Sequence, residues 1–252
     1  MKKEYFIEHR QNLKCGLHVN AELEIVLVID GSLAIKTDGG KIRELSGGQA
    51  MLILPHHVHA FSPKSGVNAR VMMFSHALIE QFYEKFRHCD FSENVLQVEK
   101  PLLDFCEYVL DKYKQTEDIY CVKSLFFAFA SAFSSLDLQA EKSSVKSVNV
   151  TQIMEYVYSN LGEKLTILSL SKALAINKNA LGKIFIEYTG VPFGKFLHNM
   201  RVEKSVMMLR TTDKTVTDVA YECGFGSLRT FNRVFSSIIG VTPSVFRKNL
   251  QV

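Results

Sequence analysis

The chain has 252 residues, of which 47% are hydrophobic, so it is long enough to bury the cores of two domains. Its five cysteines include no C-x-x-C pair, which argues against a disulfide framework or a zinc cluster and favours a reducing compartment. The net charge of +4 is uneven: residues 1–147 hold 17 Lys and Arg against 19 Asp and Glu, whereas 148–252 hold 13 against 7. Phosphate contact requires such a basic half, although an ordinary solvated surface is compatible with it too.

The chain offers no candidate for a targeting or membrane segment. It starts with MKKEYFIEHRQ, which lacks the apolar core of a signal peptide. The most apolar run, residues 125–133, is only nine residues long and cannot span a bilayer. We therefore expect a cytoplasmic protein without a membrane partner.

Four short segments in the first part of the chain have the composition of β-strands. They are rich in Val, Ile and Leu and cover 24–29, 32–37, 50–54 and 67–74. Turn signals separate them, at Asp30-Gly31, Asp38-Gly39-Gly40, Ser46-Gly47-Gly48 and Pro63-Lys64-Ser65-Gly66. This spacing predicts an antiparallel barrel or sandwich.

The order of His, Glu and Gly in this part resembles a cupin, a small double-sheet barrel. The matching positions are His18, Glu22, Glu24, Gly31, Gly48, Pro55 and His59. The resemblance implies a sensor barrel, whose possible polar ligand contacts are Tyr5, His18, His57 and His59.

A metal site at His18, Glu24, His57 and His59 is an alternative, because imidazole and carboxylate suit first-row metals. A metal-binding cupin usually has two histidines one residue apart, and here the second position is Asn20. We therefore expect no metal and no other cofactor.

From Ser75 onward the hydrophobic period becomes helical, which predicts helices at 77–86, 102–113 and 119–136. The third is apolar on more than one side, so it must bury more than one side. It is either a core helix or part of a dimer interface. The polar, aperiodic stretch 137–149 is the best candidate for an interdomain linker.

The last third of the chain contains an internal repeat, at 166–190 and 215–240. Each copy combines a short apolar helix, a tight turn and a longer helix with an outward basic residue, Lys183 or Arg233. The second copy turns at Gly224, whereas the first has no glycine there. This pattern is typical of a helix-turn-helix, which places a helix in the major groove of DNA.

Residues able to cap helices precede three of the four helices of the repeat. Asn177 and Ser227 stand before the two longer helices, and Thr215 or Thr217 stands before the short helix of the second copy. Further helices are expected at 151–161, ahead of the repeat, and at 193–209, between its copies. The latter would be a rod of about 25 Å, able to place two recognition helices in successive major-groove segments about 34 Å apart.

Residues 150–247, which include both copies, resemble the DNA-binding domain of the AraC/XylS family of bacterial transcription regulators, most specifically in the second copy and its flank. The positions that match the family signature are Ala220, Gly224, Phe225, Phe231, Arg233, Phe235, Gly240, Thr242, Pro243, Phe246 and Arg247. The first copy departs at Gly182, where the recognition helix often carries a larger polar residue. The residues expected to bind DNA are Asn179, Lys183, Leu228, Arg229, Thr230, Asn232 and Arg233.

The expected fold is α+β, with a cupin-like sensor barrel at 1–75, helices for dimerisation at 76–136, a linker at 137–149 and an all-α DNA-binding domain at 150–252. The resemblance implies a homodimeric, non-enzymatic regulator, of activator type, whose partners are double-stranded DNA, RNA polymerase and a small-molecule effector. Two alternatives remain: a metal-dependent cupin enzyme with a helical scaffold, and a DNA-binding protein without a ligand.

Overall fold

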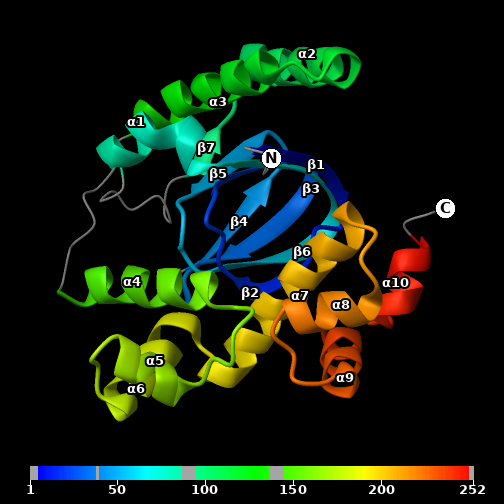
Figure 1. Cartoon of the computed structure of the whole chain (residues 1–252). Coiled ribbons are helices and arrows are strands. Elements are labelled where there is room, and N and C mark those ends of the chain that lie inside the picture. Colours follow the sequence, from blue (N-terminus) through cyan, green and yellow to red (C-terminus); the bar gives the residue numbers. More distant parts are fainter. Residues whose placement is uncertain (1–4, 38–39, 87–94, 137–144, 250–252) are drawn as a thin grey trace.

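The protein is described by a computed structural model, which covers residues 5–37, 40–86, 95–136 and 145–249. Figure 1 shows a β-sheet body in the middle of the molecule. The helices of residues 76–134 lie on one side of it, and those of residues 145–249 lie on the other. The predicted α+β class, with a β domain followed by an all-α domain, is confirmed.

The strands of the described residues belong to one antiparallel sheet. They are β1 (Tyr5–Gln11), β2 (Cys15–His18), β3 (Leu23–Lys36), β4 (Ile42–Ser46), β5 (Gln49–Ile53), β6 (His59–Phe74) and β7 (Val95–Gln97). The order is β1-β6-β3-β5-β7, with β2 added to β6 and β4 added to β3. The sheet folds over itself but does not close into a barrel. Its last strand, β7, comes from the segment predicted to be only helical.

Two of the predicted turns are wrong, because they lie inside long strands. The predicted strands 24–29 and 32–37 are both part of β3, which continues through Gly31 with shifts in register. Gly31 has φ +83°, and a Cβ there would lie 2.5 Å from the carbonyl oxygen of Ser65. The segment from Pro63 to Gly66 is likewise part of β6 and pairs with β3. A glycine with positive φ occurs both in β-bulges and in turns, so Gly31 and Gly66 were compatible with either feature.

The turn predicted at residues 46–48 does connect two strands, β4 and β5. The turn predicted at residues 38–40 falls largely outside the described residues.

Strand β3 buries side chains on both of its faces. Ile25 and Leu27 face the helices of residues 76–134, whereas Val26 and Val28 face the interior of the folded sheet. This alternation follows from the period of two along a strand. Both faces of the sheet are therefore occupied by packing, which leaves the ends and edges of its strands for a site.

The helices that cover the first face are α1 (His76–Phe86), α2 (Lys100–Thr116) and α3 (Ile119–Ser134). Phe126 of α3 packs against Phe74 of β6, with ring centroids 5.0 Å apart. The apolar stripe of α3 therefore packs in the core, which is one of the two alternatives considered from the sequence. Phe127 lies off that stripe and is 57% exposed.

The second group consists of seven helices: α4 (Val145–Ser159), α5 (Ile167–Ala173), α6 (Lys178–Thr189), α7 (Phe193–Thr211), α8 (Val216–Glu222), α9 (Leu228–Ile239) and α10 (Pro243–Asn249). Helix α7 has 19 residues, which is about 28 Å at 1.5 Å per residue. It joins the pair α5–α6 to the pair α8–α9 (Figure 1). The segment predicted as a linker, 137–149, overlaps α4 from Val145 onward, while 137–144 lie outside the described residues.

The sheet domain and the helical domain share a hydrophobic core. Leu17, Val19 and Val58 of the sheet domain are buried in the same cluster as side chains of α4, α6 and α7. The amide of Val19 donates to the sulfur of Met200 on α7, 3.0 Å away. The sequence did not predict this docking, because it joins residues about 180 positions apart.

Candidate functional site

Helices α5 and α6 form the first helix-turn-helix unit. Thr166 caps α5 through a capping box with Ser169, and the Asn177 side chain accepts hydrogen bonds from the amides of Asn179 and Ala180 at the start of α6. In the turn between these helices, Ala175 has the left-handed φ of +52°. The predicted cap at Asn177 is confirmed.

Helices α8 and α9 form the second unit, with the same arrangement of caps. Thr215 accepts from the amide of Asp218, and Ser227 accepts from that of Thr230. Gly224 turns the chain between the helices with φ +83°. Of the two threonines considered for the first cap, Thr215 therefore performs the role.

Gly224 also lies at the junction between the two units. A Cβ on it would lie 2.3 Å from the carbonyl oxygen of Leu161 and 2.8 Å from Nη2 of Arg201. Arg201 is buried on α7, where its Nε donates to Leu161 O at 3.0 Å and its Nη2 donates to Glu163 O at 2.7 Å. The Arg201 guanidinium therefore contacts both the segment that connects α4 to α5 and the turn of the second unit.

Five of the seven residues expected to bind DNA are exposed. Asn179 and Lys183 lie on α6, and Arg229, Asn232 and Arg233 lie on α9. Lys183, Arg229 and Arg233 form no ion pair within the described part of the chain, so their charges are available to a partner. The helical faces opposite them carry the buried residues Leu181 and Phe185 on α6, and Phe231 and Phe235 on α9.

The other two residues of that set, Leu228 and Thr230, are half-buried in the first turn of α9. Leu228 packs at the edge of the core of the second unit, and the Thr230 hydroxyl lies 3.0 Å from that of Ser227. Ile186, an apolar residue of α6 outside the predicted DNA-binding set, is 54% exposed. Its position fits the helical period, because the buried residues Leu181, Phe185 and Thr189 are four apart and Ile186 lies off their stripe.

A cavity of about 690 Å³ lies between the sheet domain and the helical domain. Its walls include Phe61 and Met73 from the sheet, Tyr158 from α4, and Met200 and Met207 from α7. Most of this lining is apolar. Burial raises the pKa of the Tyr158 phenol to about 12, so this hydroxyl stays protonated.

Charged side chains also line the cavity. Glu8 of β1 pairs with Arg10 at 2.7 Å and with Arg210 of α7, also at 2.7 Å. Burial raises the pKa of the Glu203 carboxyl on α7, which lies near Cys15. Residues of α7 thus form one wall, whereas the sequence indicated only a connecting rod.

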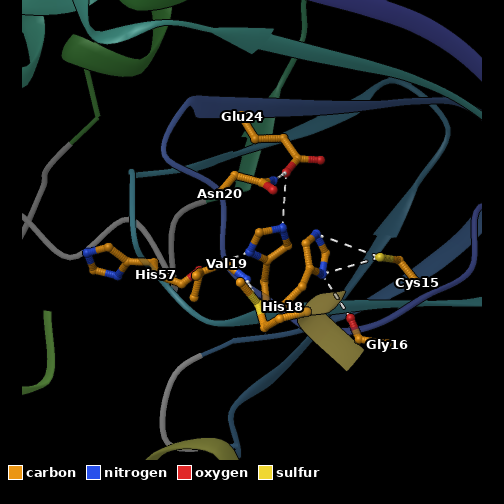
Figure 2. A network of polar contacts seen from close by, with 9 residues as sticks. Cys15, Gly16, His18, Val19, Asn20, Glu24 and His57 are labelled. Atoms are coloured by element: carbon orange, nitrogen blue, oxygen red, sulfur yellow. Dashed lines mark hydrogen bonds and ion pairs between the residues drawn. The ribbon is translucent and has the colours of Figure 1, made fainter. Parts of the chain in front are cut away.

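Two histidines and a glutamate converge beside this cavity (Figure 2). His18, Glu24 and His59 are all buried, and one donor atom from each lies within 4.8 Å of the others. Glu24 Oε2 accepts a hydrogen bond from Asn20 Nδ2 at 2.7 Å and lies 3.0 Å from His59 Nε2. The His18 and His59 rings lie 4.1 Å apart between centroids.

The surroundings of this cluster lower the pKa values of both His18 and Glu24, for different reasons. Burial, together with the neighbouring His59, lowers the pKa of His18 to about 3, which keeps its imidazole neutral. Burial alone would raise the pKa of Glu24, but His59, His18 and the hydrogen bond from Asn20 outweigh it and lower that pKa. The cluster therefore holds a carboxylate beside a neutral imidazole.

Of the four possible ligand contacts in the sheet domain, the structure brings two together. His18 and His59 are in the cluster. The ring of His57 points away from it in Figure 2, although the His57 carbonyl lies 3.0 Å from Nδ1 of His59. Tyr5 is elsewhere, because its hydroxyl lies 2.5 Å from that of Tyr113 on α2.

The fold and these sites define a class of protein: a two-domain chain in which a cupin-like domain adjoins a pair of helix-turn-helix units. Two family models match it, an AraC-like ligand binding domain at residues 3–108 and a helix-turn-helix domain at residues 170–249. The chain belongs to the AraC family of helix-turn-helix regulators.

Similar proteins include regulators from two bacterial genera. An HTH-type transcriptional regulator of Staphylococcus aureus strain COL is 35% identical over 98 residues, which are 39% of this chain but only 13% of the staphylococcal protein. The Msm operon regulatory protein of Streptococcus mutans is 23% identical over 187 residues, which are 74% of this chain and 66% of that protein.

Solved structures of ToxT from Vibrio cholerae have the same fold over nearly the whole chain. One of them, bound to an unsaturated fatty acid, has a TM-score of 0.67 and 15% identity, and the match covers 98% of this chain and 95% of that one. The apo form of a ToxT variant gives a TM-score of 0.68, also at 15% identity, over 99% and 98% of the two chains. Among the described residues of our protein, no helix has the length and apolar character needed to cross a membrane.

Proposed function

We propose that this protein is a sequence-specific DNA-binding transcription regulator controlled by a small molecule. The observation that carries the proposal is the duplicated helix-turn-helix, in which α6 and α9 present Lys183 and Arg233 at equivalent exposed positions. A helix with basic and amide side chains on its outer face is suited to the major groove. The rod α7 sets the spacing between the two recognition helices.

The two units have different roles in this proposal. On α9, Arg229, Asn232 and Arg233 contact base edges and phosphates, and Leu228 and Thr230 in its first turn add contacts near the DNA. On α6, Asn179 and Lys183 provide fewer contacts, because Gly182 between them has no side chain. We therefore assign most of the base discrimination to the second unit.

The effector site is the cavity between the domains. Its volume of about 690 Å³ is in the range of small-molecule sites. A molecule bound there would touch the sheet and α7 together, so it would act on the element that positions both recognition helices. The fatty acid in the ToxT structure supports an organic effector as a class. His18 borders this cavity, but Tyr5 does not.

The remaining partners follow from surfaces and from the family. We assign dimerisation to α2 and α3, because Tyr108, Tyr120 and Phe127 are large exposed side chains on these helices. Contact with RNA polymerase, activation of transcription and a cytoplasmic location complete the proposal. No enzymatic activity is expected.

Selection of bound duplexes from a random DNA library, using the full chain, tests the DNA-binding function. We expect one enriched sequence, protection of about 20 base pairs on one face by each chain, and an affinity that falls steeply with salt as counterions are released. Absence of any enriched sequence and of salt-sensitive binding would refute the proposal. That result is also what the cupin-enzyme alternative predicts.

A screen for ligand-induced shifts in melting temperature tests the control by a small molecule. A compound that fits the cavity is expected to raise Tm and to change the affinity for the selected DNA. If Met207→Trp, which fills the cavity, leaves both effects intact, the effector does not bind there. A regulator without a ligand would show no Tm shift with any compound.

A further inference from the structure

We propose that the cavity between the domains selects an uncharged effector, because Glu8 neutralises two arginines that would otherwise bind an anion. This inference rests on the proposed function, in which a small molecule occupies that cavity. Four acidic and four basic side chains line the cavity together with the apolar ones. Its preference for ligand charge therefore depends on which of these groups are already paired within the protein.

The two arginines face Glu8 from different domains. Glu8 and Arg10 are two residues apart on β1, so their side chains lie on the same face of the strand. Arg10 Nε lies 2.7 Å from Glu8 Oε2, and Nη1 of Arg210 on α7 donates to Glu8 Oε1, also at 2.7 Å. Each carboxylate oxygen is thus engaged by one guanidinium. The three side chains are only 23–30% exposed, so water screens these pairs weakly.

A second carboxyl group lies near the same arginines. Glu203 is seven residues before Arg210 on α7, which places both on one face of the helix. Burial raises the pKa of the Glu203 carboxyl. A hydrogen bond with Cys15 and the charges of Arg10 and Arg210 oppose this shift. The protein therefore sets two carboxyl groups of its own against two guanidiniums. An anionic ligand here would meet the Glu8 carboxylate, and a cationic one would meet both arginines.

The other charged groups of the lining are either exposed or already paired. The exposed ones are Lys14, Glu155 and Lys204. Glu24 is buried, but its carboxylate accepts a hydrogen bond from Asn20 at 2.7 Å and lies 3.0 Å from Nε2 of His59. An ionised effector would lose its hydration in the cavity without gaining a buried, unpaired counterion among these residues. An uncharged effector avoids that cost.

A carboxylate could bind the two arginines only by displacing Glu8. Because Glu8 belongs to the sheet domain and Arg210 to the helical domain, this exchange would break an ion pair between the domains. It would also leave a partly buried carboxylate without a counterion, which is unfavourable. The effector therefore differs in charge from the fatty acid of the ToxT structure. Phe61, Met200 and the protonated hydroxyl of Tyr158 suit an apolar molecule with an uncharged polar group.

Binding of three matched probes to the full chain, without DNA, tests this selectivity. Decanol, decanoate and decylamine have the same alkyl chain, and at neutral pH they are uncharged, anionic and cationic. We expect decanol to bind and to raise Tm, and the two ions to bind at least about tenfold more weakly. Calorimetry below the micelle concentration measures the three affinities. Decanoate or decylamine binding as tightly as decanol, or no binding of any of the three, would overturn the proposal.

Variants show whether Glu8 is responsible. Glu8→Gln keeps the shape of the side chain but removes its charge, so it releases Arg10 and Arg210 for a ligand. We expect the affinity for decanoate to rise by about tenfold or more. Adding Arg210→Gln to Glu8→Gln should remove this gain. Glu155→Gln, which changes an exposed acidic residue of the same lining, is the matched control and should not alter decanoate binding.

The outcomes separate this inference from the proposed function. If Glu8→Gln has the Tm and DNA affinity of a folded protein but gains no decanoate binding, Glu8 does not set the selectivity. The protein would then still be a ligand-controlled regulator, since the DNA selection and the screen of compounds test that function separately. If Glu8→Gln fails to fold, the order of the three affinities in the wild-type chain decides the question.

Discussion

Ala175 and Gly224 occupy the same position in the turns of the two helix-turn-helix units, and both have a left-handed backbone, with φ +52° and +83°. Left-handed backbone costs an L-residue about 1–2 kcal/mol, which glycine avoids. We therefore predict that Ala175→Gly stabilises the protein, by about 0.5–1 kcal/mol after the greater entropy of glycine in the unfolded chain is subtracted. Urea denaturation of the two proteins measures the difference.

The reverse change at the equivalent position should have the opposite sign. Gly224→Ala introduces the same left-handed strain, about 1–2 kcal/mol, and also brings a Cβ within 2.3 Å of Leu161 O. We therefore expect the free energy of unfolding to fall by more than the strain alone. Equal effects at the two positions would contradict the packing of Gly224 against Leu161 and Arg201.

Arg201 stabilises the junction between the two units. It is buried and supplies hydrogen bonds to Leu161 O and Glu163 O, and its guanidinium lies 6.0 Å from the centroid of Phe225. Arg201→Met removes these donors and leaves two acceptors without them, so we predict a loss of about 2–3 kcal/mol in the free energy of unfolding. Lys204→Met, exposed on the same helix, is the control and should cost less than about 0.5 kcal/mol.

The two recognition helices should contribute differently to DNA binding. Arginine can grip guanine with two hydrogen bonds, whereas lysine acts more as a point charge. Arg233→Ala is therefore expected to lose about 1–3 kcal/mol of discrimination at one or two base pairs, and Lys183→Ala to weaken binding evenly across sequences. Both residues are exposed, so both variants should remain folded. Selection of bound DNA sequences with each variant tests this assignment. If Lys183→Ala changes the preferred sequence and Arg233→Ala changes only the salt dependence of binding, base discrimination belongs to the first unit instead.

Leu17 connects the stability of the two domains. It belongs to the sheet domain, yet it is buried in the cluster that includes Phe196 and Met200 of α7. We predict that Leu17→Ala costs about 2–5 kcal/mol and reduces the hydrogen-exchange protection of α7. Leu168→Ala, at a half-exposed site on α5, is the control. Loss of protection confined to the strands would show that the domains unfold independently.

Local signals in the sequence were enough to locate most helices. Asn177, Thr215 and Ser227 act on amides within three residues of themselves, so the starts of three helices could be predicted from short segments. The repeat identified both recognition helices, and the exposed positions of Asn179, Lys183, Arg229, Asn232 and Arg233 agree with its period. The strands were less well predicted, because Gly31 indicates positive φ but not whether the chain turns back or continues through a bulge.

Which segments of the sheet and of the helical domain lie next to each other could be learned only from the tertiary structure. The cupin pattern included His18, Glu24 and His59, but their convergence depends on the pairing of β2 and β3 with β6, and Nε2 of His59 meets a carboxylate 35 residues away. The cavity depends on the docking of α4 and α7 against the sheet, as in the contact of Val19 with Met200. Capping and periodicity act over a few residues along one segment, and therefore a sequence can reveal them. A cavity between domains is made by side chains on separate segments, and its shape exists only after those segments have packed.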